Sequence, residues 1–162
     1  FHAFGLTMLL RHIGSGNTIL MRERFDASAI LDDFVEHGIN IFHGVPTMFI
    51  GMLGVESLRA RNIAATLSFV TSGGAPLPAQ VACDFREKTG LTILPGWGMS
   101  EAAAIGCQQI PGGPVRNGAI GLPLPGIEIQ VVDLEDPTRV LGTGETGELR
   151  IAARNVFALL VV

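Results

Sequence analysis

The chain has 162 residues, of which 48% are hydrophobic and 16% are charged, and its formal net charge is −4. That length suffices for one domain with a substantial core. Lys and Arg are scattered and outnumbered by Asp and Glu, and no apolar run has the length of a membrane span, which argues against nucleic-acid binding and against a transmembrane segment. Cys83 and Cys107 lack partners at metal-ligand spacing, so we expect reduced thiols and a cytoplasmic location.

Short β-prone runs alternate with longer segments of helical spacing. The runs expected to form buried strands are residues 18–21, 40–43, 67–71 and 92–95. The segments expected to form helices are residues 25–38, with Asp26 as N-cap and a stop at Gly38, residues 45–54, opened by Pro46, and residues 76–90, with Pro78 in the first turn and a stop at Gly90. The first of these helices has a predicted apolar face made of Ile30, Leu31, Phe34 and Val35.

This alternation predicts an α/β fold with a largely parallel sheet and crossover helices over residues 18–95. In such sheets, ligands bind beyond the carboxyl ends of the strands. Two glycine-rich loops follow expected strands, namely TSGGAP at residues 71–76 and GWGMSE at residues 96–101. We therefore expect both loops to face one crevice.

After about residue 110 the chain changes to closely spaced turns and short β segments. Residues 1–110 are therefore the expected α/β portion, and residues 111–162 a β-rich hairpin tail with strands at 127–133 and 148–152. GTGETG at residues 142–147 matches the dinucleotide-binding pattern G-x-G-x-x-G. That pattern requires a helix after the glycines, whereas a strand is expected here, so we predict a turn between two strands.

The second glycine-rich loop carries side chains suited to a nucleotide. Ser100 and Glu101 offer the hard oxygen atoms that suit phosphate and Mg²⁺, and Trp97 offers a flat face. The glycines of SGGAP let a planar ring approach the backbone closely. The residues alone leave two possibilities open: a nucleotide pocket, or a solvent-exposed turn with Trp97 as local core. A serine hydrolase is not supported, because GWGMSEA lacks the G-x-S-x-G elbow, and His12 and His37 are assigned no function.

Six short segments follow one another in a fixed order: FHAFGL (1–6), GVPTMF (44–49), TSGGAPLP (71–78), GWGMSEA (96–102), GAIGLPLPGIEIQVVD (118–133) and GETGELRI (144–151). They resemble successive motifs of the adenylate-forming (AMP-binding) acyl-CoA synthetase superfamily. The resemblance extends from residue 1 to about residue 158, the middle of that family's large N-terminal region. GVPTMF is closest in style to fatty-acyl-CoA synthetases, and no carboxylate is placed to bind an amino acid's amine.

The resemblance implies an enzyme that activates a small-molecule carboxylate with ATP and Mg²⁺, forms an acyl adenylate, and passes the acyl group to coenzyme A. Trp97 stands where the family commonly has tyrosine, so it would stack on adenine without the phenol's hydroxyl. The nucleotide-binding residues that the resemblance implies are Gly73, Gly74, Ala75 and Pro76 on one wall, and Trp97, Gly98, Met99 and Ser100 on the other.

The resemblance also implies catalytic roles. Ser100 replaces the family's usual threonine, whose hydroxyl contacts phosphate, and Glu101 matches the acid that holds Mg²⁺. His2 resembles the position near the carboxylate substrate and the approaching thiol, with a capping or core histidine as the alternative. Met48 and Phe49 are expected to form apolar walls for a fatty or other apolar acid.

The family's upstream phosphate loop with its Lys, its downstream ribose-binding Asp and its catalytic Lys have no counterpart in this sequence. Leu159, Leu160 and Val161 stand where the family usually continues Gly-Tyr-Trp. We therefore expect residues 1–162 to be a partial adenylation domain, truncated at both ends and inactive in isolation. The alternative hypothesis is a non-catalytic remnant with at most weak nucleotide or partner binding.

Overall fold

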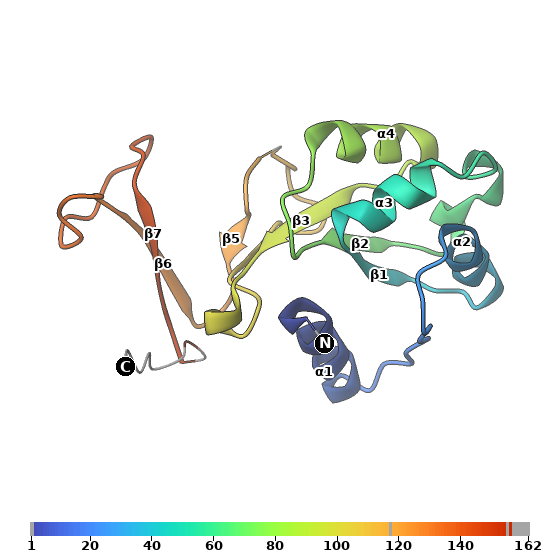
Figure 1. The fold of residues 1–162 in the computed structure, drawn as a ribbon, viewed down its shortest axis with the longest axis horizontal. Coiled ribbons are helices and arrows are strands. Elements are labelled where there is room, and N and C mark those ends of the chain that lie inside the picture. Colours follow the sequence, from blue (N-terminus) through green and yellow to red (C-terminus); the bar gives the residue numbers. More distant parts are fainter. Residues whose placement is uncertain (1, 117, 155, 157–162) are drawn as a thin grey trace.

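A computed structural model describes residues 2–116, 118–154 and 156. The chain forms an α/β body from which a two-stranded arm extends (Figure 1). The prediction of an α/β fold with a sheet, crossover helices and a β hairpin is confirmed. The segment around Leu159, where the expected motif is not continued, lies outside the described residues.

Five strands form one sheet in the order β1-β2-β3-β4-β5. They are β1 (Ile41–Gly44), β2 (Phe69–Ser72), β3 (Ile93–Trp97), β4 (Cys107–Gln108) and β5 (Leu122–Pro123). β1, β2 and β3 run parallel, with His43 opposite Thr71. β4 and β5 join antiparallel, because the chain reverses after β3. The strands predicted at 40–43, 67–71 and 92–95 are thus confirmed as β1, β2 and β3, with ends displaced by one or two residues.

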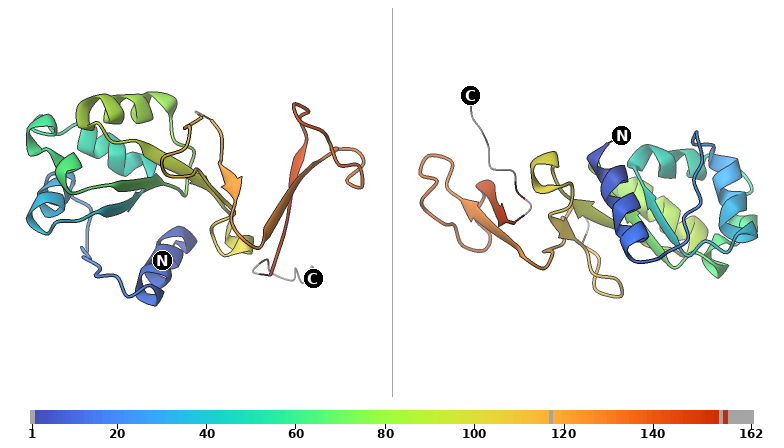
Figure 2. Two further views of the ribbon diagram at one scale, coloured as in Figure 1. Left: turned by 180° about the vertical axis from the view of Figure 1, so that it is seen from behind. Right: turned by 90° about the horizontal axis from the view of Figure 1, so that it is seen from below.

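Helices cover both faces of the sheet (Figures 1 and 2). They are α1 (Ala3–Gly14), α2 (Ala27–Glu36), α3 (Pro46–Leu53) and α4 (Ala79–Thr89), with short 3₁₀ turns η1 (Arg59–Arg61) and η2 (Ile63–Ala65) leading into β2. α3 and α4 pack on one face, whereas α1 lies across the opposite face. No helix among the described residues combines the length and apolar character that crossing a bilayer requires.

The helix boundaries follow the signals in the sequence. Asp26 caps α2 by accepting a hydrogen bond from Ala29 N at 2.8 Å, and Pro46 opens α3. Gly90 ends α4 with a φ of +77°, a left-handed conformation that glycine adopts without the steric cost of a Cβ.

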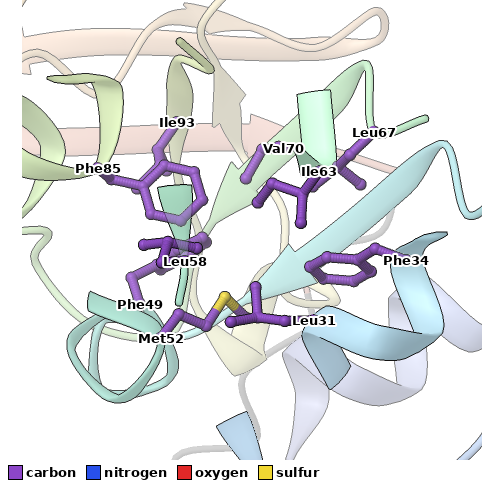
Figure 3. Close-up of a cluster of buried hydrophobic side chains, with 10 residues drawn as sticks. All are labelled: Leu31, Phe34, Phe49, Met52, Leu58, Ile63, Leu67, Val70, Phe85 and Ile93. Atoms are coloured by element: carbon purple, nitrogen blue, oxygen red, sulfur yellow. The ribbon is translucent and has the colours of Figure 1, made fainter. Parts of the chain in front are cut away.

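The core lies between the sheet and helices α2, α3 and α4 (Figure 3). Its buried side chains are Leu31, Phe34, Phe49, Met52, Leu58, Ile63, Leu67, Val70, Phe85 and Ile93. Phe49 packs edge to face against Phe42 and Phe85, with ring centroids 5.8 and 5.3 Å away. Burial of each such side chain stabilises the fold by about 1.5–3 kcal/mol. Phe49 is therefore a core residue, which corrects its expected role as a wall of an acyl pocket.

Residues 18–21 do not form the predicted strand but an extended connection between α1 and α2. Ile19 is 36% exposed and Met21 is 72% exposed, and no strand in the described part of the chain pairs with them. Strand propensity reflects packing on a sheet, so an apolar run without a neighbouring strand does not become one.

The buried face of α2 also differs from its prediction. Val35 is 47% exposed, whereas Asp33 is only 4% exposed. Arg22 donates hydrogen bonds to both carboxylate oxygens of Asp33, from Nη2 to Oδ1 at 2.7 Å and from Nε to Oδ2. These hydrogen bonds hold the pKa of Asp33 below its usual range. A carboxylate can occupy this face because the guanidinium supplies the partner that a buried charge needs.

The arm consists of β6 (Ile127–Val132) and β7 (Glu148–Ala153), which pair antiparallel. The strands predicted at 127–133 and 148–152 are therefore confirmed. Residues 142–147 lie between them and lead into a strand rather than a helix, so the prediction that GTGETG forms a turn is also confirmed. Glu145 closes that turn by accepting a hydrogen bond from Gly142 N at 2.6 Å.

Candidate nucleotide-binding site

A cavity of about 600 Å³ opens at the carboxyl ends of β2 and β3. Its walls come from the loop after β2, strand β3 with the turn that follows, one face of α4, and residues 115 and 118–120. The predicted site residues that line it are His2, Gly74, Ala75, Pro76, Trp97, Gly98, Met99 and Ser100. The prediction that the two glycine-rich loops face one crevice is therefore confirmed.

The segment after β2 forms the first wall. Gly74 has a φ of +78°, which suits glycine because no Cβ clashes there. Gly73 instead lies beneath α1, where the Cε2 of Phe4 would be 2.6 Å from a Cβ on that glycine. It also donates a hydrogen bond to Gly44 O at 3.2 Å. Gly73 was expected to line the cavity, but it packs on the side of the wall that faces α1 instead.

Trp97 belongs to the second wall and is the last residue of β3, so the strand runs past its predicted end at residue 95. The indole ring lies against Gly106, where an added Cβ would be 2.8 Å from Cζ3. Gly106 N donates a hydrogen bond to Trp97 O at 2.8 Å. Because Gly106 has no side chain, the indole packs directly against its backbone. Trp97 also lines the cavity.

The turn after Trp97 has a strained backbone. Ala103 and Ala104 have φ values of +52° and +79°, a conformation that costs residues with a Cβ about 1–3 kcal/mol each. Gly98 permits this turn, because a Cβ there would lie 1.7 Å from Ala104 O. Thr7 of α1 donates a hydrogen bond to Ala103 O at 3.0 Å and holds the turn from outside. Such strain is typical of functional sites.

Ser100 and Glu101 lie in the short 3₁₀ turn η3 (Ser100–Ala102). Ser100 lines the cavity, whereas Glu101 is exposed next to it and does not. Among the residues described, no cluster of three or more His, Cys, Asp or Glu side chains could hold a metal ion. Mg²⁺ is commonly bound by one or two carboxylates together with substrate phosphates. A single exposed carboxylate beside the cavity fits a site of that kind.

His2 has two roles in the structure. Its Nδ1 accepts a hydrogen bond from Phe4 N at 3.2 Å and caps α1, so the capping interpretation is confirmed. The same residue lines the cavity. Because Nδ1 accepts, the neutral ring carries its proton on Nε2, which can therefore act as a donor.

Sequence reasoning missed the contribution of α4. Cys83 and Arg86 line the cavity, together with Ala79 and Ala82, and residues three and four apart share a helix face. Phe85 is buried in the core on the other side, so helical periodicity could have identified the cavity-facing set. Arg86 carries the only formal positive charge among the described lining residues.

The contribution of residues 115 and 118–120 to the cavity wall was also missed. Buried Gln109 donates from Nε2 to Arg116 O and to Ala119 O, each at 2.8 Å. Gly121, with a φ of +95°, lets this segment cross β4, since a Cβ would lie 2.1 Å from the carbonyl carbon of Gln108. The sequence shows a turn here but carries no local signal of what the turn covers.

A second cavity, of about 640 Å³, contains none of the predicted site residues. Its lining is mainly apolar and includes two guanidinium groups, those of Arg11 and Arg154. Met48 and Phe49, the expected acyl-pocket residues, line neither cavity.

The chain is similar in sequence and in fold to known proteins. The family described as AMP-binding enzyme matches residues 1–159. The chain is 29% identical over 157 residues to a long-chain-fatty-acid–CoA ligase of Bacillus subtilis (strain 168), covering 96% of this chain. It is 32% identical over 154 residues to benzoate–CoA ligase of Thauera aromatica, covering 94% of this chain. ATP-bound MatB from Rhodopseudomonas palustris matches 97% of this chain with a TM-score of 0.86 and 27% identity. The chain spans 28%, 29% and 30% of the lengths of these three proteins.

Proposed function

The chain belongs to the AMP-binding enzyme family, and we propose that it forms part of an ATP-dependent ligase that converts a carboxylic acid into an acyl adenylate and then an acyl-CoA thioester. The observation that carries the proposal is a single cavity lined by both Gly74–Pro76 and Trp97–Ser100. Residues 1–162 are proposed to be one part of a longer adenylation domain, because the chain spans less than a third of these relatives' lengths.

Adenine is proposed to lie between the backbone of residues 74–76 and the indole of Trp97. Stacking of a base on an aromatic side chain contributes about 1–3 kcal/mol, and glycine lets the backbone come close to the ring. A volume of about 600 Å³ is suitable for a small-molecule ligand. Gly98 and Met99 continue this wall toward Ser100, where the phosphates would lie.

In the proposed first step, a carboxylate oxygen bonds to the α-phosphorus of ATP, the bond from that phosphorus to the bridging oxygen breaks, and pyrophosphate leaves. Negative charge grows on the phosphate oxygens during this transfer. The Ser100 hydroxyl would donate a hydrogen bond to one of them, which stabilises the transition state. Glu101 would hold Mg²⁺, which neutralises phosphate charge as a Lewis acid when bound.

In the proposed second step, the sulfur of coenzyme A bonds to the acyl carbon and its proton passes to solvent, while the bond from that carbon to the phosphate oxygen breaks and AMP leaves. His2 is proposed to lie near the carboxylate and the approaching thiol, where its Nε2–H can donate a hydrogen bond. The support is that its ring lines the same cavity as Gly74 and Ser100.

The acid is proposed to be a fatty acid or another apolar acid, used in the cytoplasm with ATP and coenzyme A as the other small-molecule partners. The named substrates of the relatives, a long-chain fatty acid and benzoate, favour this class. The chain in isolation is expected to be inactive.

The proposal is tested by ATP–pyrophosphate exchange with the full-length protein that contains this chain, supplied in turn with acetate, octanoate, palmitate and benzoate. We expect exchange that requires both an acid and Mg²⁺, and AMP release when coenzyme A is added. A folded full-length protein that exchanges with none of these acids would instead support the non-catalytic remnant.

Trp97→Ala in the full-length protein should raise the Kd for ATP about 5- to 150-fold, because the stacking surface is lost. Isothermal titration calorimetry measures the change directly. Trp97→Phe is the matched control and should retain most of the affinity, since it keeps an aromatic ring. Equal ATP affinity in Trp97→Ala and the unsubstituted protein would remove Trp97 from the nucleotide site.

A further inference from the structure

Helix α1 is held on the sheet by few contacts. Met8 is its one buried residue among those described, whereas Leu6, Leu10 and Ile13 are 53%, 58% and 60% exposed. Among the described residues, side-chain hydrogen bonds therefore add to the attachment of α1 that Met8 provides. Its first turn nevertheless matters for the site, because His2 caps the helix and lines the cavity.

A chain of hydrogen bonds ties the far end of α1 to the sheet. Asn17 Nδ2 lies 2.7 Å from His12 Nδ1, and His12 Nε2 lies 2.8 Å from His43 Nε2 on β1. His43 Nδ1 lies 2.6 Å from Thr71 Oγ1 on β2. Thr71 is 3% exposed and lies two residues before Gly73, which supports the first cavity wall. The series therefore joins α1 to β1 and β2.

The donor at one end fixes the direction of the whole series. An amide nitrogen only donates, so His12 Nδ1 must accept from Asn17, and neutral His12 carries its proton on Nε2. His43 Nε2 then accepts from His12, which places the His43 proton on Nδ1, where it donates to Thr71. Protonation of His43 would place a second N–H on its Nε2, which would then face the N–H of His12 Nε2 at 2.8 Å. The series is complete only when both rings are neutral.

We propose that the neutral His12–His43 pair is a positioning latch, which holds α1 on β1 and β2 and thereby holds His2 at the cavity, and which opens when His43 takes up a proton. The positioning role rests on the proposed function, since it concerns the placement of His2 for that reaction. His12 and His43 act through His2 and are positioning residues.

The surroundings of the His43 ring favour its neutral form. Arg11 lies beside His12 on α1, Phe69 of β2 meets the His43 ring edge to face with centroids 6.1 Å apart, and no carboxylate is among the described partners of either ring. Burial is the main cause that lowers the pKa of His43 from 6.5 to about 4, and the positive charge of Arg11 adds to it. A released His43 would therefore take up a proton near pH 6.5, whereas the latched one would not until about pH 4, so the latch weakens as the pH falls through this window.

Hydrogen–deuterium exchange tests the latch in the full-length protein, at about pH 7.5 and about pH 5.5, after correction for intrinsic exchange. Protonation of released His43 should raise the open population of α1 about tenfold over this interval. The protection of the amides of residues 3–14 from exchange should fall accordingly, while the amides of residues 27–36 in α2 should keep their protection. His12→Phe should remove the pH dependence and leave α1 poorly protected at both pH values.

His37→Phe is the matched control, because His37 is an exposed histidine at the C-cap of α2, outside the series. In ATP–pyrophosphate exchange assays, His12→Phe should lower kcat about tenfold at about pH 7.5 and leave the KM for ATP within about twofold. Thr71→Val removes only the hydroxyl that accepts the hydrogen bond from His43. Like His12→Phe, it should lower both the protection of α1 from hydrogen exchange and the kcat of pyrophosphate exchange.

Protection of α1 that is independent of pH, or equal behaviour of His12→Phe and His37→Phe, would overturn the latch. Hydrogen–deuterium exchange does not depend on catalysis. It therefore still tests whether the latch exists if the full-length protein shows no ATP–pyrophosphate exchange. In that case the proposed function fails separately.

Discussion

Glu101→Gln in the full-length protein should lower the rate of ATP–pyrophosphate exchange on the order of 10²- to 10³-fold, by analogy with the loss of one electrostatic partner of a developing charge. Glutamine keeps the shape of the side chain but removes the charge that would hold Mg²⁺. Glu101 is exposed and does not line the cavity, so the substitution leaves the cavity walls in place. The expected loss is therefore in turnover rather than in folding.

Glu56→Gln is the matched control, because Glu56 is an exposed glutamate between α3 and η1. It should exchange at the unsubstituted rate. Thermal unfolding of both variants checks that neither has lost stability. An unchanged rate for Glu101→Gln at saturating Mg²⁺ would reject Glu101 as the metal ligand.

Gly98→Ala should lower the rate of ATP–pyrophosphate exchange at least about 100-fold, because displacing the reacting groups by about 1 Å can slow a reaction that much. An added Cβ would lie 1.7 Å from Ala104 O and 2.7 Å from Ile105 Cα. Both are backbone atoms, so no side-chain rotation relieves the clash. The turn that carries Ser100 and Glu101 must therefore move.

Gly14→Ala is the control for Gly98→Ala, since a Cβ on Gly14 meets nothing within 4 Å. Its exchange rate should match that of the unsubstituted protein. The thermal midpoint of Gly98→Ala should fall only slightly, because the turn lies outside the core of α2, α3, α4 and the sheet. Full activity in Gly98→Ala would contradict the claim that this turn positions the reacting groups.

Local signals in the sequence account for most of the body of the fold. Asp26, Pro46 and Gly90 set helix boundaries through interactions with their own neighbours, which a sequence displays directly. The failure at residues 18–21 has the opposite cause. Whether an apolar run becomes a strand depends on a partner strand elsewhere in the chain, and local composition does not show that partner.

The same distinction applies to the site. Trp97 and Ser100 were found because they lie in one glycine-rich loop after a strand. Gly73 was misplaced because its packing against Phe4 joins segments far apart in the sequence. Arg86 was missed because its contribution depends on where α4 sits on the sheet, which only the packing of Phe85 and the rest of the core determines.

The central claim is that adenine binds between Gly74–Pro76 and Trp97. The most direct test is photolabelling of the full-length protein with an ATP analogue that carries an azide on adenine, followed by mass spectrometry of the peptides. The account predicts ATP-protected labelling of peptides that contain residues 74–76 or 97–100. Labelling that ATP prevents but that maps only to other segments would contradict it.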